Sequence, residues 1–593
     1  MKNTVLYLKS YYFLFIVIAY YLFYYVVNQL FINHFLYYYY TLFIITGIVI
    51  LSVFIKNLIQ RKTKLLLPRS QLIWAGAFLV TYPFVNFVIL KTAEWYYFSY
   101  IVTVFVLYFG FTIGFYNKLL YSEKIKKVLI LIAFTEIVIS FLQYFNILPH
   151  NQYFSVNGTC SNPNFTAVYL VMVLPMVIDI VKQYKNKYHR ILSITAIIVI
   201  FALSLYLLKS RTAFVGFFIC VGFLLFSYLT KNRLVSKKVI FTGVILSIIV
   251  IGFLIPKFYN FKKESADGRL LVWKISSQVI THKPITGYGY GKTQYAYNVA
   301  QAKYFRDQKA TETEKQNAGY ISNVLNDYLE IWIQGGLIGL LIFSFFLYRL
   351  LFVSYKQREK YPYLFVGILL FVVMSFFNVV IFFTFTAVIF AFYASLITVN
   401  TIQKQDIKTP KILYNGFVLV FCFVLVYISI QAYSQTQLNK VKDALIERDL
   451  IRVRKYLDNS SRCIATSEFF YTISGDTYYM EKKYNLALKK YSIAFKYAPN
   501  PKLATKMAEC YMSVNKQEKA ISKLEYASNH TPSLFRPYYI LMLIYNKQGD
   551  MQRAMQTANI IINKEIKVDS REVRFYKNKA TEILKSYQYE NKK

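Results

Sequence analysis

Long apolar runs separated by short polar segments dominate the chain up to about residue 432. Runs of this length can cross a bilayer as helices, because about 20 residues span its hydrocarbon core. The pair between residues 362 and 398 is closely joined, which leaves the number of helices at twelve or thirteen. The pattern therefore predicts an all-α fold with a polytopic membrane helix bundle in residues 1–432. The predicted spans are residues 11–31, 35–55, 72–90, 97–117, 126–147, 165–181, 191–208, 212–230, 239–255, 328–353, 362–377, 379–398 and 412–430.

From residue 433 the sequence becomes polar and a repeat of 33 to 34 residues begins. Small residues, large residues one turn away and a closing proline recur in register: Gly475, Tyr478, Ala487, Tyr491, Ala494 and Pro499; Ala508, Tyr511, Ala520, Leu524, Ala527 and Pro532; and Met542, Tyr545, Ala554, Ala558 and Ile561. This spacing resembles the tetratricopeptide repeat (TPR), in which helix pairs stack because one pair cannot bury its own apolar face. We expect residues 433–593 to form a TPR-like α-solenoid, with a degenerate helix pair at about 437–463 and a final helix at about 571–588. Such an array either binds a peptide or protein ligand or acts as a spacer.

The formal net charge of +40 does not indicate a nucleic-acid-binding protein, because much of it lies in short loops between apolar runs. These basic loops alternate along the chain, at residues 56–69, 118–127, 182–190, 231–238, 356–360 and 404–411. The short loops of the other side hold only Lys91, Lys209 and Arg211. The positive-inside rule then places the N-terminus in the cytoplasm, and the large loop at about 256–322 and the repeat domain outside. We expect a multi-pass membrane protein with an extracytoplasmic repeat domain.

Neither a cleavable signal peptide nor a metal site is expected. The first apolar run lacks a small-residue cleavage site and should remain as an anchor. The five cysteines show no metal-ligand spacing, and the predicted outer segments hold no His, Cys and Asp cluster. No cofactor is implied.

Four short passages at the outer ends of the predicted helices carry polar residues and glycines. They read GTCSNPNFTAVYL from residue 158, LKSRTAFVGFF from residue 208, DGRLLVWKISSQVITHKPITGYGYG from residue 267 and ISNVLNDYLEIWIQGGLIGLL from residue 321. With the number of spans and the large loop after the ninth, they resemble the O-antigen ligase and O-antigen polymerase superfamily of membrane glycan transferases. The resemblance in motifs covers about residues 150–345.

The first two passages supply candidate contacts to a glycan and to phosphate. Asn162 and Asn164, around Pro163, either cap the following helix or contact sugar. Ser210 and Arg211 match a Ser-Arg pair of the family, whose arginine is expected to engage a lipid-linked pyrophosphate. A guanidinium at a helix N-terminus suits an anion, although an isolated arginine there could equally extend to the membrane interface.

The third passage contains Arg269 and Trp273, which match the family's Arg-x-x-x-Trp element and share one face of a helix. Arg269 is predicted to be a second phosphate contact. Trp273 is either a stacking surface for a sugar ring or an interfacial anchor. The turn that follows, with Gly287 and Gly289, is expected to let backbone amides approach the substrate.

The fourth passage departs from the family at one position. Many O-antigen ligases have a histidine immediately before the asparagine that corresponds to Asn326, and this histidine has been assigned a catalytic role; here Leu325 precedes Asn326. Asp327, Glu330 and His282 are the candidate replacements, and the sequence does not choose among them. Glu330 could also be an ordinary solvated carboxylate at a helix entrance.

The resemblance implies transfer of a glycan from a polyprenyl-pyrophosphate carrier to a lipid or protein acceptor on the extracytoplasmic face. It also implies a location in the bacterial inner membrane, with a periplasmic repeat domain. Two arginines would stabilise the charge that develops on the pyrophosphate. Two alternatives stay open: a polymerase of repeat units from the same superfamily, and a non-enzymatic export or scaffold protein of the envelope.

Overall fold

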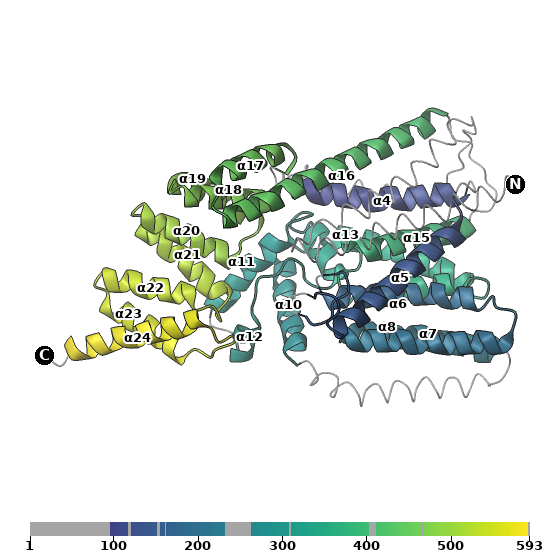
Figure 1. Cartoon of the computed structure of the whole chain (residues 1–593), viewed down its shortest axis with the longest axis horizontal. Coiled ribbons are helices and arrows are strands. Elements are labelled where there is room, and N and C mark those ends of the chain that lie inside the picture. The colour runs from purple at the N-terminus through teal and green to yellow at the C-terminus, as the bar shows by residue number, and fades with distance from the viewer. Residues whose placement is uncertain are drawn as a thin grey trace.

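The computed structural model describes residues 95–116, 120–150, 154–160, 162–231, 263–307, 310–401, 411–464 and 468–590. Every regular element in these ranges is a helix, which confirms the all-α prediction for the described part of the chain (Figure 1). The predicted spans at 11–31, 35–55, 72–90 and 239–255 lie outside the described residues.

The other nine predicted spans each contain a helix, and these helices pack into one bundle. Their bounds are α4 (Trp95–Tyr116), α5 (Ser122–Tyr144), α6 (Pro163–Val181), α7 (Lys187–Leu207), α8 (Arg211–Lys231), α13 (Asp327–Lys356), α14 (Pro362–Met374), α15 (Thr384–Thr401) and α16 (Lys411–Ile446). Among the described helices, α6, α7, α13 and α15 have the length and composition needed to cross a membrane. Helices α6 and α15 are mostly buried inside the bundle, whereas α7 and α13 turn largely apolar faces outward, as lipid contact requires.

The apolar run at 362–398 contains two helices joined by a folded turn at residues 375–383. A buried carboxylate holds this turn. Asp327 Oδ2 accepts hydrogen bonds from Ser375 Oγ (2.8 Å) and from the amides of Val380 (2.9 Å) and Ile381 (3.1 Å). Because Asp327 pairs backbone groups that would otherwise be unsatisfied, the chain can leave the helix inside an apolar environment.

The expected outer loop at 256–322 contains a small helical layer of its own. Helices α10 (Lys263–His282), α11 (Thr293–Arg306) and α12 (Glu312–Asn317) enclose a core that includes Leu271, Ile275, Val279, Tyr297 and Phe305. The apolar positions of α10 recur every three to four residues, which gives the helix one buried face. In Figure 1 this layer lies between the bundle and the repeat domain.

The repeat region consists of consecutive helices stacked on one another (Figure 1). They are α17 (Leu450–Ile464), α18 (Glu468–Met480), α19 (Tyr484–Tyr497), α20 (Pro501–Ser513), α21 (Gln517–His530), α22 (Arg536–Lys547), α23 (Met551–Asn563) and α24 (Arg571–Glu590). The pairs α18–α19, α20–α21 and α22–α23 coincide with the three units found in the sequence. A Cβ atom on Gly475 would lie 2.4 Å from the ring of Tyr491, which explains the small residue at that repeat position.

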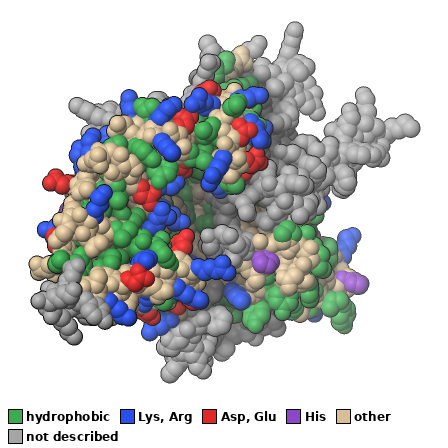
Figure 2. All heavy atoms as spheres, turned by 60° about the vertical axis from the view of Figure 1, so that its left-hand side comes forward, with side chains coloured by type: hydrophobic (Ala, Val, Ile, Leu, Met, Phe, Trp, Pro, Cys, Tyr) green, Lys and Arg blue, Asp and Glu red, His purple; other side chains and the backbone are tan. Residues whose placement is uncertain are grey.

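The predicted domain boundary at residues 432 and 433 falls inside α16, which runs without interruption from the bundle into the repeat region. Figure 2 shows that Lys and Arg side chains on the exposed repeat face are interspersed with acidic and apolar ones. This mixed surface lacks the continuous basic stripe that is typical of nucleic-acid binding.

Candidate functional site

A cavity of about 1130 Å³ lies where the starts of α6 and α8 meet α10. The rest of its lining comes from Phe154, α11, the segment at residues 317–321, Leu325 and Phe377. The cavity brings together six residues that the sequence singled out: Asn162, Asn164, Ser210, Arg211, Arg269 and Trp273. They come from positions up to 111 residues apart, from Asn162 to Trp273.

The charge of the cavity wall is strongly positive. Lys209, Arg211, Lys263 and Arg269 all line it, and Glu264 is the only carboxylate among its described lining residues. Burial, followed by the charge of nearby Arg211, lowers the pKa of Arg269 to about 10. Arg269 therefore stays cationic at neutral pH, and the mutual repulsion of the two guanidinium groups favours a bound anion between them.

A side-chain hydrogen-bond network fixes the helix start that carries Arg211. Asn164 Oδ1 accepts hydrogen bonds from Ser210 Oγ (2.5 Å) and Thr212 Oγ1 (3.0 Å). Its Nδ2 donates to Asn378 Oδ1 in the turn between α14 and α15. Ser210 and Thr212 are the neighbours of Arg211 in the chain. Asn164 therefore connects both neighbours of Arg211 to α6.

The same turn holds Arg269 from the opposite direction. Arg269 Nη1 donates to the carbonyl oxygen of Phe377 at 3.0 Å, and the rings of Trp273 and Phe377 have centroids 6.4 Å apart. Both side chains project from α10 one turn apart, as their spacing predicted. The Nε1 atom of Trp273 is buried and makes no hydrogen bond within the described part of the chain.

Asn162 acts as a helix cap at the edge of the cavity. Its side-chain oxygen accepts a hydrogen bond from the Asn164 amide at 2.9 Å, which begins α6. The loop before it is held from α5, where Glu136 accepts hydrogen bonds from the Thr159 amide (2.9 Å) and hydroxyl. A Cβ atom on Gly158, which has φ +64°, would lie 2.5 Å from Glu136 Oε2.

The three candidate bases do not line the cavity. His282 is an exposed residue at the end of α10. Asp327 holds the 375–383 turn, as described above. Glu330 is buried and accepts hydrogen bonds from the Val324 amide (3.0 Å) and Gln334 Nε2 (2.7 Å). In this structure none of the three side chains faces the cavity.

The passage that contains Asn326 contributes to the cavity through the residue before it. Asn326 caps α13 by accepting hydrogen bonds from the amides of Tyr328 (3.0 Å) and Leu329 (3.1 Å). Leu325 lines the cavity and has φ +52°, a conformation that is costly for a branched residue. The position at which the sequence differs from the motif that it resembles therefore faces the cavity, with an apolar side chain that cannot transfer a proton.

The glycine turn packs against α13 and does not line the cavity. Gly287 has φ +68°, and a Cβ atom there would lie 2.5 Å from the carbonyl oxygen of Gln334. The amide of Gly289 donates to that same oxygen at 2.9 Å. Facing the turn, α13 is kinked at Gly336, whose φ is +63°. The sequence suggested that the amides of this turn contact the substrate. In the structure they form hydrogen bonds with the kinked helix instead.

Several lining residues were not singled out in the sequence, namely Lys263, Glu264, Tyr297, Gln301, Tyr320 and Phe377. Asn378, which anchors Asn164, was missed as well. The signal for Asn378 was a polar pair, Ser375 and Asn378, inside an otherwise apolar run. Glu136, which holds the loop before α6, was also missed. Its signal in the sequence was a carboxylate within a predicted membrane span, which is costly unless it is paired or functional. No group of three or more His, Cys, Asp or Glu residues in the described ranges could hold a metal ion.

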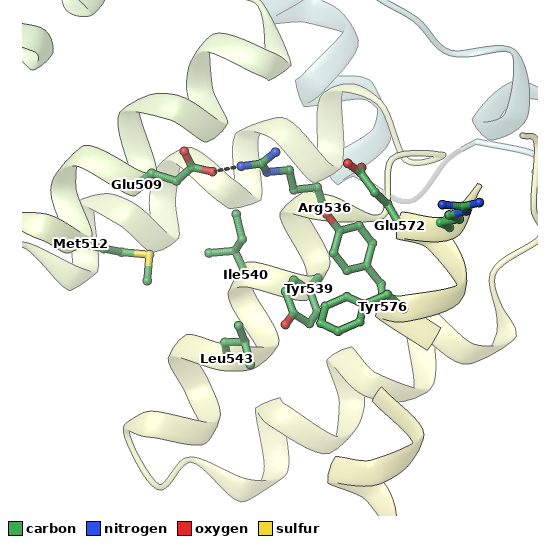
Figure 3. Close-up of a pocket in the computed structure, with 10 residues that line it drawn as sticks. Glu509, Met512, Arg536, Tyr539, Ile540, Leu543, Glu572 and Tyr576 are labelled. Carbon is green, nitrogen blue, oxygen red and sulfur yellow. Dashed lines mark hydrogen bonds and ion pairs between the residues drawn. The ribbon is translucent and has the colours of Figure 1, made fainter. Parts of the chain in front are cut away.

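A second cavity, of about 560 Å³, lies in the repeat region between α20, α22 and α24 (Figure 3). Tyr539 and Tyr576 stack at its wall with ring centroids 4.5 Å apart. Arg536 Nη2 lies 2.6 Å from Glu509 Oε1 across it. Its lining is mainly aromatic and aliphatic, which suits an apolar or aromatic segment of a ligand.

Comparison with known proteins points to glycan chemistry. Residues 196–344 match the family model described as O-antigen ligase. A protein named "Putative polysaccharide ligase" from Rickettsia bellii (strain RML369-C) is 26% identical over 264 residues, which cover 42% of this chain and 59% of that protein. The matched family segment contains both cavity arginines and Trp273. The chain is therefore similar to O-antigen ligases in this part, and its apolar helices indicate a membrane protein.

Proposed function

We propose that this protein is an O-antigen ligase-like enzyme that moves a glycan from a polyprenyl-pyrophosphate carrier to a lipid or protein acceptor. The observation that carries the proposal is that Arg211 of α8 and Arg269 of α10 line one cavity. The similarity to O-antigen ligases over residues 196–344 supports it. The helix ends around the cavity are those that the basic loops predict to be extracytoplasmic, which is the side where we place the reaction.

The proposed reaction exchanges one bond at the anomeric carbon of the glycan. The acceptor oxygen or nitrogen attacks this carbon, and the bond to the pyrophosphate oxygen breaks with its electron pair staying on the pyrophosphate. Arg211 and Arg269 stabilise this developing charge, and Lys209 and Lys263 add to the positive potential. Fixed cations in a partly dehydrated cavity need little reorganisation as the charge develops, so they lower the barrier more than the same charges would in water.

The acceptor must also lose a proton. Glu264 is the carboxylate that lines the cavity, and we propose it as the proton acceptor in place of His282, Asp327 and Glu330. Its place five residues before Arg269 on α10 puts the base and a phosphate contact on one rigid element.

The repeat region offers a docking surface for a polypeptide, which makes a protein acceptor attractive. Its second cavity, with the stacked Tyr539 and Tyr576, would receive part of such a ligand (Figure 3). A lipid acceptor would instead reach the first cavity from the membrane. Mass spectrometry of the product, formed from the full chain, lipid-linked glycan and each acceptor, distinguishes the two.

The decisive test substitutes the two arginines. In membrane vesicles that contain the purified chain, Arg211→Ala and Arg269→Ala should each lower the transfer rate about 100-fold or more, because each removes a stabilising charge from the transition state. Arg→Lys at the same sites should restore part of the rate, since charge is kept and the planar pair of donors is lost.

The matched control is Arg553→Ala, which removes a largely exposed guanidinium of the repeat region. It should leave the rate unchanged. Full transfer by both arginine variants would contradict the enzymatic proposal and favour a scaffold or export protein.

A further inference from the structure

The repeat region contacts the helical layer of the outer segment through α21 and α11. At the centre of this contact is His530, the last residue of α21. His530, Asn298 and Gln301 are all buried, with exposed fractions of 0 to 1%. Asn298 and Gln301 lie one turn apart on α11, and both reach His530 and the cavity wall.

Asn298 connects the imidazole of His530 to Ile321, which lines the cavity. Its Oδ1 lies 2.9 Å from His530 Nε2 and accepts a hydrogen bond from the Ile321 amide at 3.3 Å. Its Nδ2 donates to the carbonyl oxygens of Gln294 (2.7 Å) and Ile321 (3.0 Å). Because Nδ2 is committed to these carbonyls, Oδ1 is the acceptor, and His530 Nε2 must carry the hydrogen.

Gln301 makes a second, parallel connection. Its Nε2 donates to the carbonyl oxygen of His530 at 2.8 Å and to that of Gly319 at 3.0 Å. Gln301 and Gly319 both line the cavity. One residue of the repeat region is thus linked, through two side chains of α11, to both ends of the 319–321 segment.

The contact consists of neutral groups. Burial lowers the pKa of His530 to about 3, so the ring is uncharged at neutral pH, and its Nδ1 lies 2.8 Å from Thr531 Oγ1. The rings of Tyr320 and Tyr526 cover it, with centroids 6.4 and 5.8 Å away. An amide side chain could replace the donor function of such a ring, whereas alanine could not.

We propose that the repeat region supports the wall of the substrate cavity from behind. His530 is the positioning residue: it holds α11 and residues 319–321, which we assign as the glycan subsite. This inference rests on the proposed function. It divides the cavity into a cationic half, which takes the pyrophosphate, and a half of aromatic and amide groups, which takes the sugar.

The chemistry of the second half suits a sugar. Tyr297 is fully buried, and its hydroxyl, like the Nε1 of Trp273, makes no hydrogen bond within the described part of the chain. Both residues line the cavity. Unpaired buried donors cost free energy, which a glycan hydroxyl accepting their hydrogens would recover. Aromatic faces, here Trp273 and Tyr320, also pack against the C–H surface of a sugar ring.

The test separates the sugar from the pyrophosphate. Vesicles that contain the full chain are supplied with the lipid-linked glycan extracted from cells that produce this protein, and undecaprenyl pyrophosphate is added as a competing ligand without sugar. His530→Ala should raise the KM for the extracted glycan about tenfold, because it removes the hydrogen bond between the ring and the buried Asn298 Oδ1 and leaves a void behind the wall. The inhibition constant of undecaprenyl pyrophosphate should not change.

Two comparisons keep the test specific. His530→Gln should restore most of the affinity, since its amide can donate to Asn298, and thermal unfolding verifies that both variants fold. Lys579→Ala, on the exposed face of α24, should match the unchanged protein.

A His530→Ala protein that folds and either keeps the original KM or loses affinity equally for both ligands would overturn the inference. An unchanged protein that neither transfers glycan nor binds undecaprenyl pyrophosphate would instead overturn the proposed function. The two failures are therefore distinguishable.

Discussion

Two residues of the cavity, Arg269 and Asn164, form hydrogen bonds in the structure that their motifs did not predict. Arg269 was predicted as a phosphate contact, and in the structure it is also part-buried and donates to the Phe377 carbonyl. Asn164 could have been a simple cap, yet it joins α6, α8 and the turn at residues 375–383. In both cases the identity of the side chain was visible in the sequence, and its partner was not.

Glu264 provides the prediction that belongs to this scale. Glu264→Gln should lower kcat about 100-fold or more if this carboxylate takes the acceptor proton, with little change in the binding of undecaprenyl pyrophosphate. Single-turnover transfer measures the effect on the catalytic rate, and a separate binding measurement gives the affinity for undecaprenyl pyrophosphate.

The control for Glu264 is Glu312→Gln, an exposed carboxylate of α12 that pairs with Lys315. It should transfer glycan normally. Asp327→Asn is a poor alternative test because it weakens the three hydrogen bonds that hold the 375–383 turn, so its effect would be one of folding. Normal kcat in Glu264→Gln would return the search for the base to His282 and Glu330.

Among the described elements, the glycine turn and the kinked α13 pack backbone against backbone. A Cβ atom on Gly336 would lie 2.0 Å from the carbonyl oxygen of Ile285, and one on Gly287 would meet the backbone of α13. The amide of Leu337 donates to the Pro284 carbonyl at 2.9 Å, which replaces helical bonding lost at the kink. The turn thereby attaches the helical layer of α10–α12 to the membrane bundle.

Gly287→Ala should therefore destabilise the attachment by about 2 kcal/mol or more, through both the positive φ and the clash with backbone that cannot move aside. Thermal unfolding of the detergent-solubilised protein measures this, and transfer activity should fall with it.

Gly222→Ala in α8 is the matched control, because a Cβ atom there meets nothing within 4 Å. Its unfolding temperature should stay the same or rise slightly, since alanine favours a helix. If Gly287→Ala were as stable as Gly222→Ala, the turn would not be the attachment described here.

At the scale of the whole molecule, the repeat region is joined to the rest of the chain at several places. Helix α16 is the covalent connection, and the contact of α21 with α11 is the second. Lys567 Nζ adds a hydrogen bond to the Gln316 carbonyl at 2.7 Å. A region held at several places has a fixed position relative to the cavity, which a freely tethered spacer would not have.

Deletion of residues 440–593 should consequently lower transfer to every acceptor, because it exposes Asn298 and Gln301 and leaves the cavity wall unsupported. The measurement compares rates for lipid and protein acceptors in vesicles, with Lys567→Ala as a mild variant that removes one exposed contact. Loss of transfer to a protein acceptor alone would indicate that the repeats only dock that acceptor. Unchanged rate and acceptor choice would exclude both roles.

The sequence by itself determined the helical elements, because hydrophobic periodicity reports directly which faces avoid water. It predicted the nine described bundle helices, the three repeat pairs and six of the residues that line the cavity. The spacing of Arg269 and Trp273 was readable since four residues make about one helical turn.

Only the tertiary structure decided which of these residues meet. The turn at residues 375–383, the packing of the glycine turn on α13 and the link from His530 to the cavity all join segments that are far apart in the chain. Local patterns carry no information on such contacts, because a buried hydrogen bond depends on where two elements pack and not on their sequence spacing. For the same reason Asp327, a plausible base from its motif, became intelligible as a structural residue only when its partners were seen.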